Sequence, residues 1–259
     1  MRLAKDGRQL LLVLALSMVM VLITRLPFMP THLFSFDSVN FALALEEFNP
    51  ALHQPQPPGY PFFVGEARLV NSLAGTPENT FLLIKLIISA VAVALLYLLG
   101  AQMVSRGLGL VAAALLLVNP AFWHSGLASA VRPHLALFSA LFAYLCWMSL
   151  HRDRRLLLAA SVVLGISIGF RAELPAILFP LWLWTAWNLG DRRLAAKSLG
   201  VIACGVFAYA VSIVVGSGSL GTFWESLSRY LIEQTYQSSL LTGAEVMEWK
   251  RMVGRNLVW

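Results

Sequence analysis

The stretch LIISAVAVALLYLLGAQMVS, residues 86–105, decides the fold class because it carries no charged side chain over its whole length. A helix of about 20 apolar residues spans the hydrocarbon core of a bilayer. The rest of the chain has the same character: 58% of its 259 residues are hydrophobic, 12% are charged, and the mean hydropathy is +0.73. This composition excludes a water-soluble domain and a disordered chain. The net charge of +6 comes from scattered basic residues, so nucleic acid is not an expected partner.

Seven long uncharged stretches divide the sequence. They lack the alternation of a membrane β-strand, and a segment in lipid must satisfy its own backbone groups, so helices are expected. The two shortest qualify as spans when Arg25 and Arg171 extend toward the membrane surface. The stretches are residues 9–24, 86–105, 107–131, 133–150, 156–170, 174–190 and 198–224. The sequence therefore predicts an all-α polytopic membrane protein with about seven transmembrane helices.

Basic residues indicate the orientation. When the connections are assigned alternately to two sides, one side receives ten basic residues, whereas the other receives only Arg68, Arg132 and Arg171 before the last span. Cytoplasmic connections carry the excess of Lys and Arg, so the N-terminus is expected inside a cell inner membrane. This assignment needs a tight hairpin at residues 170–173, because one long helix over 156–190 would separate the basic connections. The ten residues are Arg2, Lys5, Arg8, Arg106, Arg152, Arg154, Arg155, Arg192, Arg193 and Lys197.

We expect a single transmembrane domain over residues 1–259, incomplete at its C-terminus. Its parts are a first helix at 9–28, an outer catalytic loop at 29–80, helices two to seven at 81–216, and an outer amphipathic tail at 217–259. A short surface helix is predicted at 38–48, followed by the strip HQPQPPGYP, residues 53–61, whose prolines favour a rigid, extended conformation. A long ordered loop is usually functional, so the site is expected here.

Asp37 is the candidate general base. It is the only acidic residue between the first span and the surface helix, at headgroup depth, where a carboxylate can take a proton from an acceptor hydroxyl. The alternative is structural, because Asp37 or Ser38 precedes the surface helix in the position of an N-cap.

Arginines and histidines on the outer side supply further candidates. Arginine forks suit a phosphate, although Arg171 can instead pair with Glu173 and Arg68 can lie solvated beside Glu66. The outer histidines, His53, His124 and His134, have no spacing typical of metal ligands. No metal site is predicted.

Two motifs then resemble a known family: FDSVNFA at residues 36–42 and HQPQPPGYP at 53–61, followed by many helices. The chain resembles the membrane-embedded GT-C glycosyltransferases over residues 9–189, in particular the branch of protein O-mannosyltransferases, aminoarabinose transferases and RgtA/B/C/D-like enzymes. The proline strip also resembles the HPPGYP signature of related mannosyltransferases. Two positions depart from the family pattern, since Asp37-Ser38 replaces an Asp-Glu pair and Pro133-His134 replaces Pro-Asp.

The resemblance implies transfer of a sugar from a polyprenyl-phosphate donor to a glycan, lipid or protein acceptor at the outer face, with inversion. Asp37 takes the catalytic role in this interpretation. Substrate binding falls to His53, Pro58, Gly59, Tyr60, Arg132 and Arg171. No particular cofactor is implied, and a divalent metal remains an option. Two alternatives stay open: a transporter or lipid flippase, and a catalytically inactive transferase-like scaffold.

Overall fold

The computed structural model describes residues 2–33 and 35–238, with side chains described for 10–33 and 35–233, and this part of the chain is helical without a β-strand. Its helices are α1 (Arg2–Arg25), η1 (Leu26–Phe28), α2 (Phe36–Glu46), η2 (Pro50–Leu52), α3 (Pro61–Ala74), α4 (Pro77–Met103), α5 (Arg106–Val118), α6 (Pro120–Ala128), α7 (Pro133–His151), α8 (Leu156–Ser167), α9 (Leu174–Leu189), α10 (Arg192–Ser217) and α11 (Leu220–Ser238).

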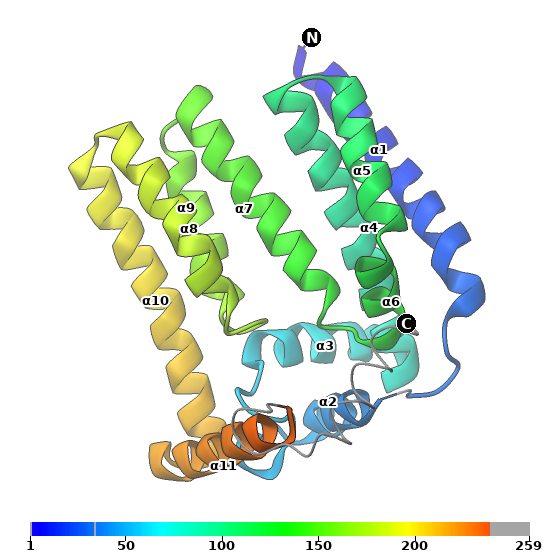
Figure 1. Cartoon of the computed structure of the whole chain (residues 1–259), viewed down its shortest axis with the longest axis vertical. Helices are drawn as coiled ribbons and strands as arrows, with labels where there is room; N and C mark the ends of the chain where they lie inside the picture. Colours follow the sequence, from blue (N-terminus) through cyan, green and yellow to red (C-terminus); the bar gives the residue numbers. More distant parts are fainter. Residues whose placement is uncertain (1, 34, 239–259) are drawn as a thin grey trace.

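The helices form an upright bundle that is covered at one end. Helices α1, α4, α5, α7, α8, α9 and α10 run roughly side by side, whereas α2, α3 and α11 lie across their lower ends in Figure 1. We call the end that carries α2, α3, α11 and the connection at 168–173 the site end. The opposite end, with the connections at 104–105, 152–155 and 190–191, is the basic end.

Four helices are long and apolar enough to cross a membrane by length and composition: α1 with η1, α4, α7 and α10. Helices α5 and α6 pass the same test together but bend by 54° at Asn119, and α8 and α9 are shorter apolar helices. An all-helical, multi-pass membrane protein is therefore confirmed. The number of seven spans stays a prediction, although every predicted stretch contains one of these helices.

The predicted hairpin at residues 170–173 is present. Helix α8 ends at Ser167 and α9 begins at Leu174, so the chain turns back between them. At the basic end, Arg154 pairs with Asp191 at 3.1 Å, joining the connection before α8 to the connection after α9. The two basic connections lie at the same end, as the charge argument required.

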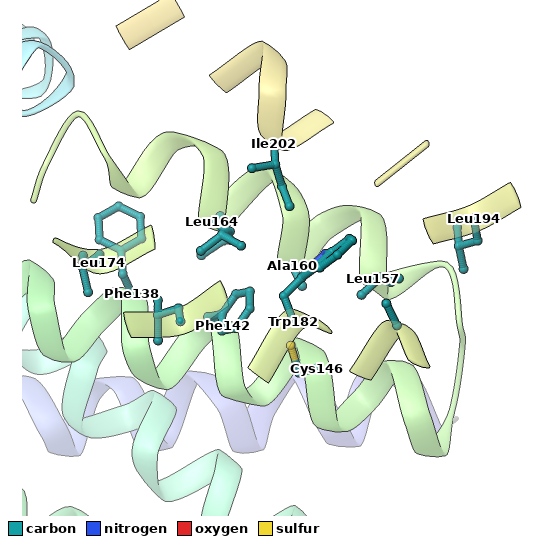
Figure 2. Close-up of a cluster of buried hydrophobic side chains, with 13 residues drawn as sticks. Phe138, Phe142, Cys146, Leu157, Ala160, Leu164, Leu174, Trp182, Leu194 and Ile202 are labelled. Carbon is teal, nitrogen blue, oxygen red and sulfur yellow. The ribbon is translucent and has the colours of Figure 1, made fainter. Parts of the chain in front are cut away.

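The largest core cluster joins α7, α8, α9 and α10. Figure 2 shows Phe142, Leu164 and Trp182 from three of these helices pointing toward one another. Helices α8 and α10 approach closely because both have glycine at the contact. A Cβ built on Gly205 would lie 2.5 Å from the carbonyl carbon of Gly165, so neither residue can carry a side chain without moving a backbone.

The region before α4 differs most from expectation. The proline strip is not extended but folds into a compact loop, and it leads directly into α3, a helix that the sequence analysis did not predict. Proline at the first helical position explains the start of α3 at Pro61. The surface helix is present but begins at Phe36 rather than Ser38. In the predicted tail, residues 220–238 form α11, and the tail residues 239–259 lie outside the described part.

Candidate functional site

Asp37 lies in the first turn of α2 and is partly buried. The N-cap of this helix is Ser35, whose side chain accepts a hydrogen bond from the backbone N–H of Ser38 at 3.2 Å. The capping alternative for Asp37 and Ser38 is therefore wrong. A carboxylate in the first helical turn lies near the positive end of the helix dipole.

The proline strip is closed by its own backbone. Asn49 N–H donates to the Gln54 carbonyl at 2.7 Å, and Gln54 N–H donates back to the Asn49 carbonyl at 3.0 Å. These bonds give the strip a fixed shape although it is neither a helix nor a strand. Proline content does not reveal such bonds, so it alone suggested an extended conformation.

Pro58 and Gly59 attach this loop to α10. The hydroxyl of Tyr209 donates to the Pro58 carbonyl at 2.9 Å. Gly59 has φ of +101°, and a Cβ there would lie 2.4 Å from Cδ1 of Ile213. Glycine is therefore required both by the backbone conformation and by the close approach of α10. Pro58 and Gly59 act as attachment points in the structure.

Tyr60 and His53 are the two non-glycine residues with left-handed backbone conformations, at φ of 49° and 60°, in the part of the chain described. The Tyr60 ring meets the edge of Phe41 with centroids 5.3 Å apart. The His53 ring meets Tyr230 of α11 at 5.9 Å, also edge to face. Such unusual conformations occur often at functional sites.

Asp37 and Arg171 both influence the pKa values of two tyrosines, Tyr60 and Tyr230. Burial raises the pKa of Tyr60 to about 12, while Arg171 lowers it and Glu173, Tyr230 and Asp37 raise it further. The pKa of Tyr230 is also raised, first by burial and then by Asp37, with Arg171 opposing. The structure therefore brings together a carboxylate from α2, a guanidinium from the connection at 168–173, Tyr60 directly before α3 and Tyr230 from α11. We call Asp37, Tyr60, Arg171 and Tyr230 the phenol cluster.

Arg171 is held by its neighbour Glu173, whose Oε1 accepts from Nε at 2.8 Å and from Nη2. The hairpin pairing that the sequence left as an alternative is thus present. The other arginine, Arg132, is exposed next to the start of α7, and no hydrogen bond or ion pair joins its side chain to another described residue. Of the two predicted phosphate ligands, the structure brings Arg171 alone to the phenol cluster.

A buried pair at the site end escaped the sequence analysis. His134 is 1% exposed, and its Nε2 lies 2.9 Å from Oε2 of Glu66 on α3, while Nδ1 lies 3.2 Å from the Val131 carbonyl. The Val131 carbonyl can only accept, so Nδ1 donates to it, and Nε2 makes the second hydrogen bond with the Glu66 carboxyl group. The imidazole stacks on Phe170 with centroids 4.9 Å apart. The pair therefore ties α3 and α7 to the residue before Arg171.

Linear spacing gave no sign that Glu66 meets His134. The departure from Pro-Asp to Pro133-His134 was the one available clue, because it marked a position where a buried polar group needs a partner. Arg68 is exposed, as expected of a solvated arginine, but it also donates from Nε and Nη2 to the carbonyls of Leu45 and Ala44 at 3.0 and 2.9 Å, at the end of α2.

Among the described residues, no group of three or more His, Cys, Asp or Glu side chains is placed to hold a metal ion.

Long apolar helices, crossing helices at one end and a polar cluster beneath them define a polytopic helical membrane protein with a site at the end of the bundle. Residues 55–216, more than half of the chain, match the family of dolichyl-phosphate-mannose-protein mannosyltransferases, and the chain belongs to this family. The family indicates a membrane glycosyltransferase of mannosyltransferase type. The matched residues include Tyr60, Arg132 and Arg171, while Asp37 and His53 precede them. No curated protein and no solved structure matches the chain.

Proposed function

We propose that the protein transfers a sugar from a polyprenyl-phosphate donor to a hydroxyl acceptor at the non-cytoplasmic face of the cell inner membrane, with inversion. The acceptor is a glycan, a lipid or a protein. The observation that carries this proposal is the phenol cluster, in which a carboxylate and a guanidinium act on the same two tyrosines at the covered end of the bundle.

In the proposed reaction, the acceptor oxygen attacks the anomeric carbon from the side opposite the phosphate. The new carbon–oxygen bond forms as the bond between the anomeric carbon and the phosphate oxygen breaks. The Asp37 carboxylate takes the acceptor proton, and the polyprenyl phosphate leaves with the bonding electron pair. Each atom is accounted for without a further reactant, and one displacement inverts the anomeric configuration.

Arg171 is the better candidate for stabilising the leaving phosphate. Its guanidinium is 22% exposed, beside the phenols, and a fixed cation there offsets the negative charge that develops on the leaving group. Binding requires Arg171 to share its donors between Glu173 and the phosphate. Arg132, being exposed and without a described partner, is assigned an outer role in acceptor or donor binding. The strip from His53 to Tyr60 forms the wall of the donor site.

The test of catalysis is Asp37→Asn in the full-length protein, reconstituted in liposomes with a polyprenyl-phosphate sugar. Removal of a general base typically costs a factor of about 10²–10⁴. The control is Glu46→Gln, which changes an exposed carboxylate on the same helix and leaves the rate within about twofold of wild type. Equal rates for Asp37→Asn and wild type would exclude the mechanism, and transfer by neither would support the inactive scaffold.

Orientation has its own test. Cysteines placed at Ser72 of α3 and at Arg106, the first residue of α5, lie at opposite ends of the bundle, in a background lacking Cys146 and Cys204. A membrane-impermeant maleimide applied to intact cells whose outer membrane has been permeabilised is expected to label Ser72→Cys and to spare Arg106→Cys. The reverse pattern would place the phenol cluster in the cytoplasm and end the proposal.

One observation favours the transporter or flippase alternative: α5 and α6 form a bent pair with a 54° break, and broken helices are frequent at transport sites. The same liposomes distinguish the two functions. A flippase moves a fluorescent polyprenyl phosphate between leaflets without an acceptor, whereas the proposed transferase consumes the donor only when an acceptor is present.

A further inference from the structure

The Glu66–His134 pair lies beside the connection that carries Arg171. Helix α3 supplies Glu66 and the first turn of α7 supplies His134. The imidazole stacks on Phe170, with ring centroids 4.9 Å apart and an interplanar angle of 28°. Phe170 immediately precedes Arg171, and it also packs against Phe138 of α7 at 4.9 Å. A change in the position of the imidazole therefore moves the side chain next to the guanidinium.

Helix α3 fixes the same connection from a second side. The backbone N–H of Phe62 donates to the Gly169 carbonyl at 3.1 Å. A Cβ built on Gly169 would overlap the Phe62 ring, so the backbone of the connection lies directly against this helix. Glu66 follows Phe62 by one turn of α3. The pair with His134 thus joins the two helices that hold the connection: α3 does so through Gly169, and α7 through the ring of Phe170.

Burial keeps the imidazole itself away from a substrate. His134 is 1% exposed, and both of its ring nitrogens have hydrogen-bond partners. Phe63, Phe138 and Phe170 surround the ring, with centroids 5.6, 6.2 and 4.9 Å away. An acid–base role needs a nitrogen within hydrogen-bond reach of the reacting proton, which this environment does not offer. The pair therefore acts through the groups that it holds in place.

We propose that Glu66 and His134 are positioning residues for Arg171: their hydrogen bond fixes α3 against α7 and so holds the connection where its guanidinium meets the leaving phosphate. This inference rests on the proposed function, because that function gives Arg171 its role in the reaction. The ion pair of Arg171 with Glu173 joins two residues of one connection. It cannot fix the connection relative to α3, whereas the Glu66–His134 pair can.

The position of α3 also determines where one phenol of the cluster lies. Burial raises the pKa of Tyr60, the N-cap of α3, while Arg171 opposes this effect, so the phenol and the guanidinium are close. The hydrogen bond to Gly169 sets how near α3 and the connection come to each other. A displacement of about 1 Å in a reacting group can cost about 10²-fold in rate. Loss of the pair is therefore expected to slow sugar transfer even when the protein folds.

The decisive experiment is a double-mutant cycle on the rate of sugar transfer by the full-length protein in liposomes. Glu66→Ala is expected to lower kcat about tenfold, a smaller loss than removal of the guanidinium itself causes. In an Arg171→Gln background, the same change is expected to lower kcat by less than about twofold, because no guanidinium remains to be positioned. Losses that multiply would mean that the pair acts on the fold as a whole, and they overturn the inference.

Three further variants separate positioning from stability. Gly205→Ala strains the contact of α10 with α8 and keeps the pair, so transfer below the unfolding temperature should stay within about twofold of wild type. A neutral imidazole that donates from Nδ1 accepts at Nε2, so the amide of Glu66→Gln can donate to it and should retain at least about a third of the rate. His134→Phe keeps a ring on Phe170 without the hydrogen bonds, and it takes the place of Glu66→Ala if that variant does not fold. Equal losses in Gly205→Ala and Glu66→Ala overturn the inference.

A measurement independent of transfer reports on the connection directly. Ala172 follows Arg171 and is partly buried, so Ala172→Cys is introduced in the background lacking the two native cysteines, and the purified protein is placed in nanodiscs. Local opening exposes such a thiol, and Glu66→Ala is expected to raise its rate of reaction with a maleimide about threefold or more. Gly205→Ala is expected to leave this rate unchanged, because its strain lies away from the connection.

The two measurements together distinguish failure of this inference from failure of the proposed function. Faster labelling, combined with a loss of transfer that disappears in the Arg171→Gln background, supports the positioning role. Unchanged labelling in both Glu66→Ala and His134→Phe overturns it, whatever the rate of transfer. Faster labelling together with full transfer by Arg171→Gln supports the hold of the pair on the connection and overturns the role of Arg171 in the proposed function.

Discussion

The two ends of α8 each carry an arginine–carboxylate pair, and the pairs differ in their surroundings. At the basic end, Arg154 pairs with Asp191 at 3.1 Å, and the arginine side chain is 67% exposed. At the site end, Arg171 pairs with Glu173 and is 22% exposed, close enough to Tyr60 and Tyr230 to change the pKa of both phenols.

This difference separates a topological role from a chemical one. An exposed ion pair contributes about 0–1 kcal/mol and is screened by salt, so the pairing of Arg154 with Asp191 adds little to stability. Arg171 lies on a connection that α3 also holds, since the backbone N–H groups of Phe62 and Phe63 both donate to the Gly169 carbonyl, at 3.1 and 3.3 Å. A cation held this firmly beside an acid is suited to a ligand.

The largest expected effect comes from neutralising these two arginines in parallel. Arg171→Gln should lower the rate of sugar transfer by a factor of about 10²–10³, the typical cost of removing one stabilising donor from a reaction centre. Arg154→Gln should leave the rate within about twofold. The measurement is initial transfer in liposomes at saturating donor. Similar losses in both variants would mean that Arg171 acts through folding, and the contrast between the ends would disappear.

Stability depends on the contact that Gly165, in the last turn of α8, makes with Gly205 of α10. Gly205→Ala places a Cβ 2.5 Å from the carbonyl carbon of Gly165, and only movement of α8 or α10 relieves this overlap. Overpacking of this kind costs about 1–3 kcal/mol. Gly200→Ala on the same helix is the control, since no atom lies within 4 Å of its added Cβ. Thermal unfolding in detergent compares them, and equal midpoints would refute the close contact.

Next in size is the buried pair of the site end. Glu66→Ala leaves Nε2 of His134, a residue 1% exposed, without its hydrogen-bond partner, at a cost of about 1–2 kcal/mol, whereas Glu66→Gln keeps a side-chain amide that can hydrogen-bond to Nε2. Thermal unfolding should therefore rank wild type and Glu66→Gln above Glu66→Ala. Glu225→Ala removes an exposed pair with Arg229 and serves as the reference for a surface contact. The same midpoint for Glu66→Ala and Glu225→Ala would contradict the role of the pair.

The sequence predicted the bundle because its signals are local. Uncharged length gives a membrane helix, and basic residues give the end of the bundle at which a connection lies, so the hairpin at 170–173 followed from charge alone. Gly165 and Gly169 have the GxxxG spacing that is typical of closely packed membrane helices, and Gly165 meets Gly205 of α10. Each of these inferences needs a few neighbouring residues and no tertiary contact.

The site end was predictable only in part, because its contacts join residues far apart in the sequence. Asp37, Tyr60 and Arg171 were chosen by residue type and resemblance, yet their grouping depends on how α2, α3 and the connection at 168–173 meet. Helix α3 was missed because it is short, follows directly on a run of prolines and contains charged residues, so its amphipathic pattern was not recognised. Glu66 and His134 are 68 positions apart, so no spacing rule joins them.

The smallest expected effect concerns the phenols and appears only in alkali. Burial raises the pKa of Tyr60 from 10.0 to about 12, so the folded state favours the neutral phenol. The stability that this group contributes is fully present below pH 10.0 and is lost as pH rises through about 12, because the unfolded chain ionises first.

Subtracting the alkaline absorbance titration of Tyr60→Phe from that of wild type isolates this phenol, which should ionise near pH 12 in native protein. The same pair in denaturant is the control, with ionisation near the ordinary value of 10.0. Native ionisation near 10.0 would mean that water reaches the phenol freely. Arg171 at the site end would then be as accessible to water as Arg154 at the basic end.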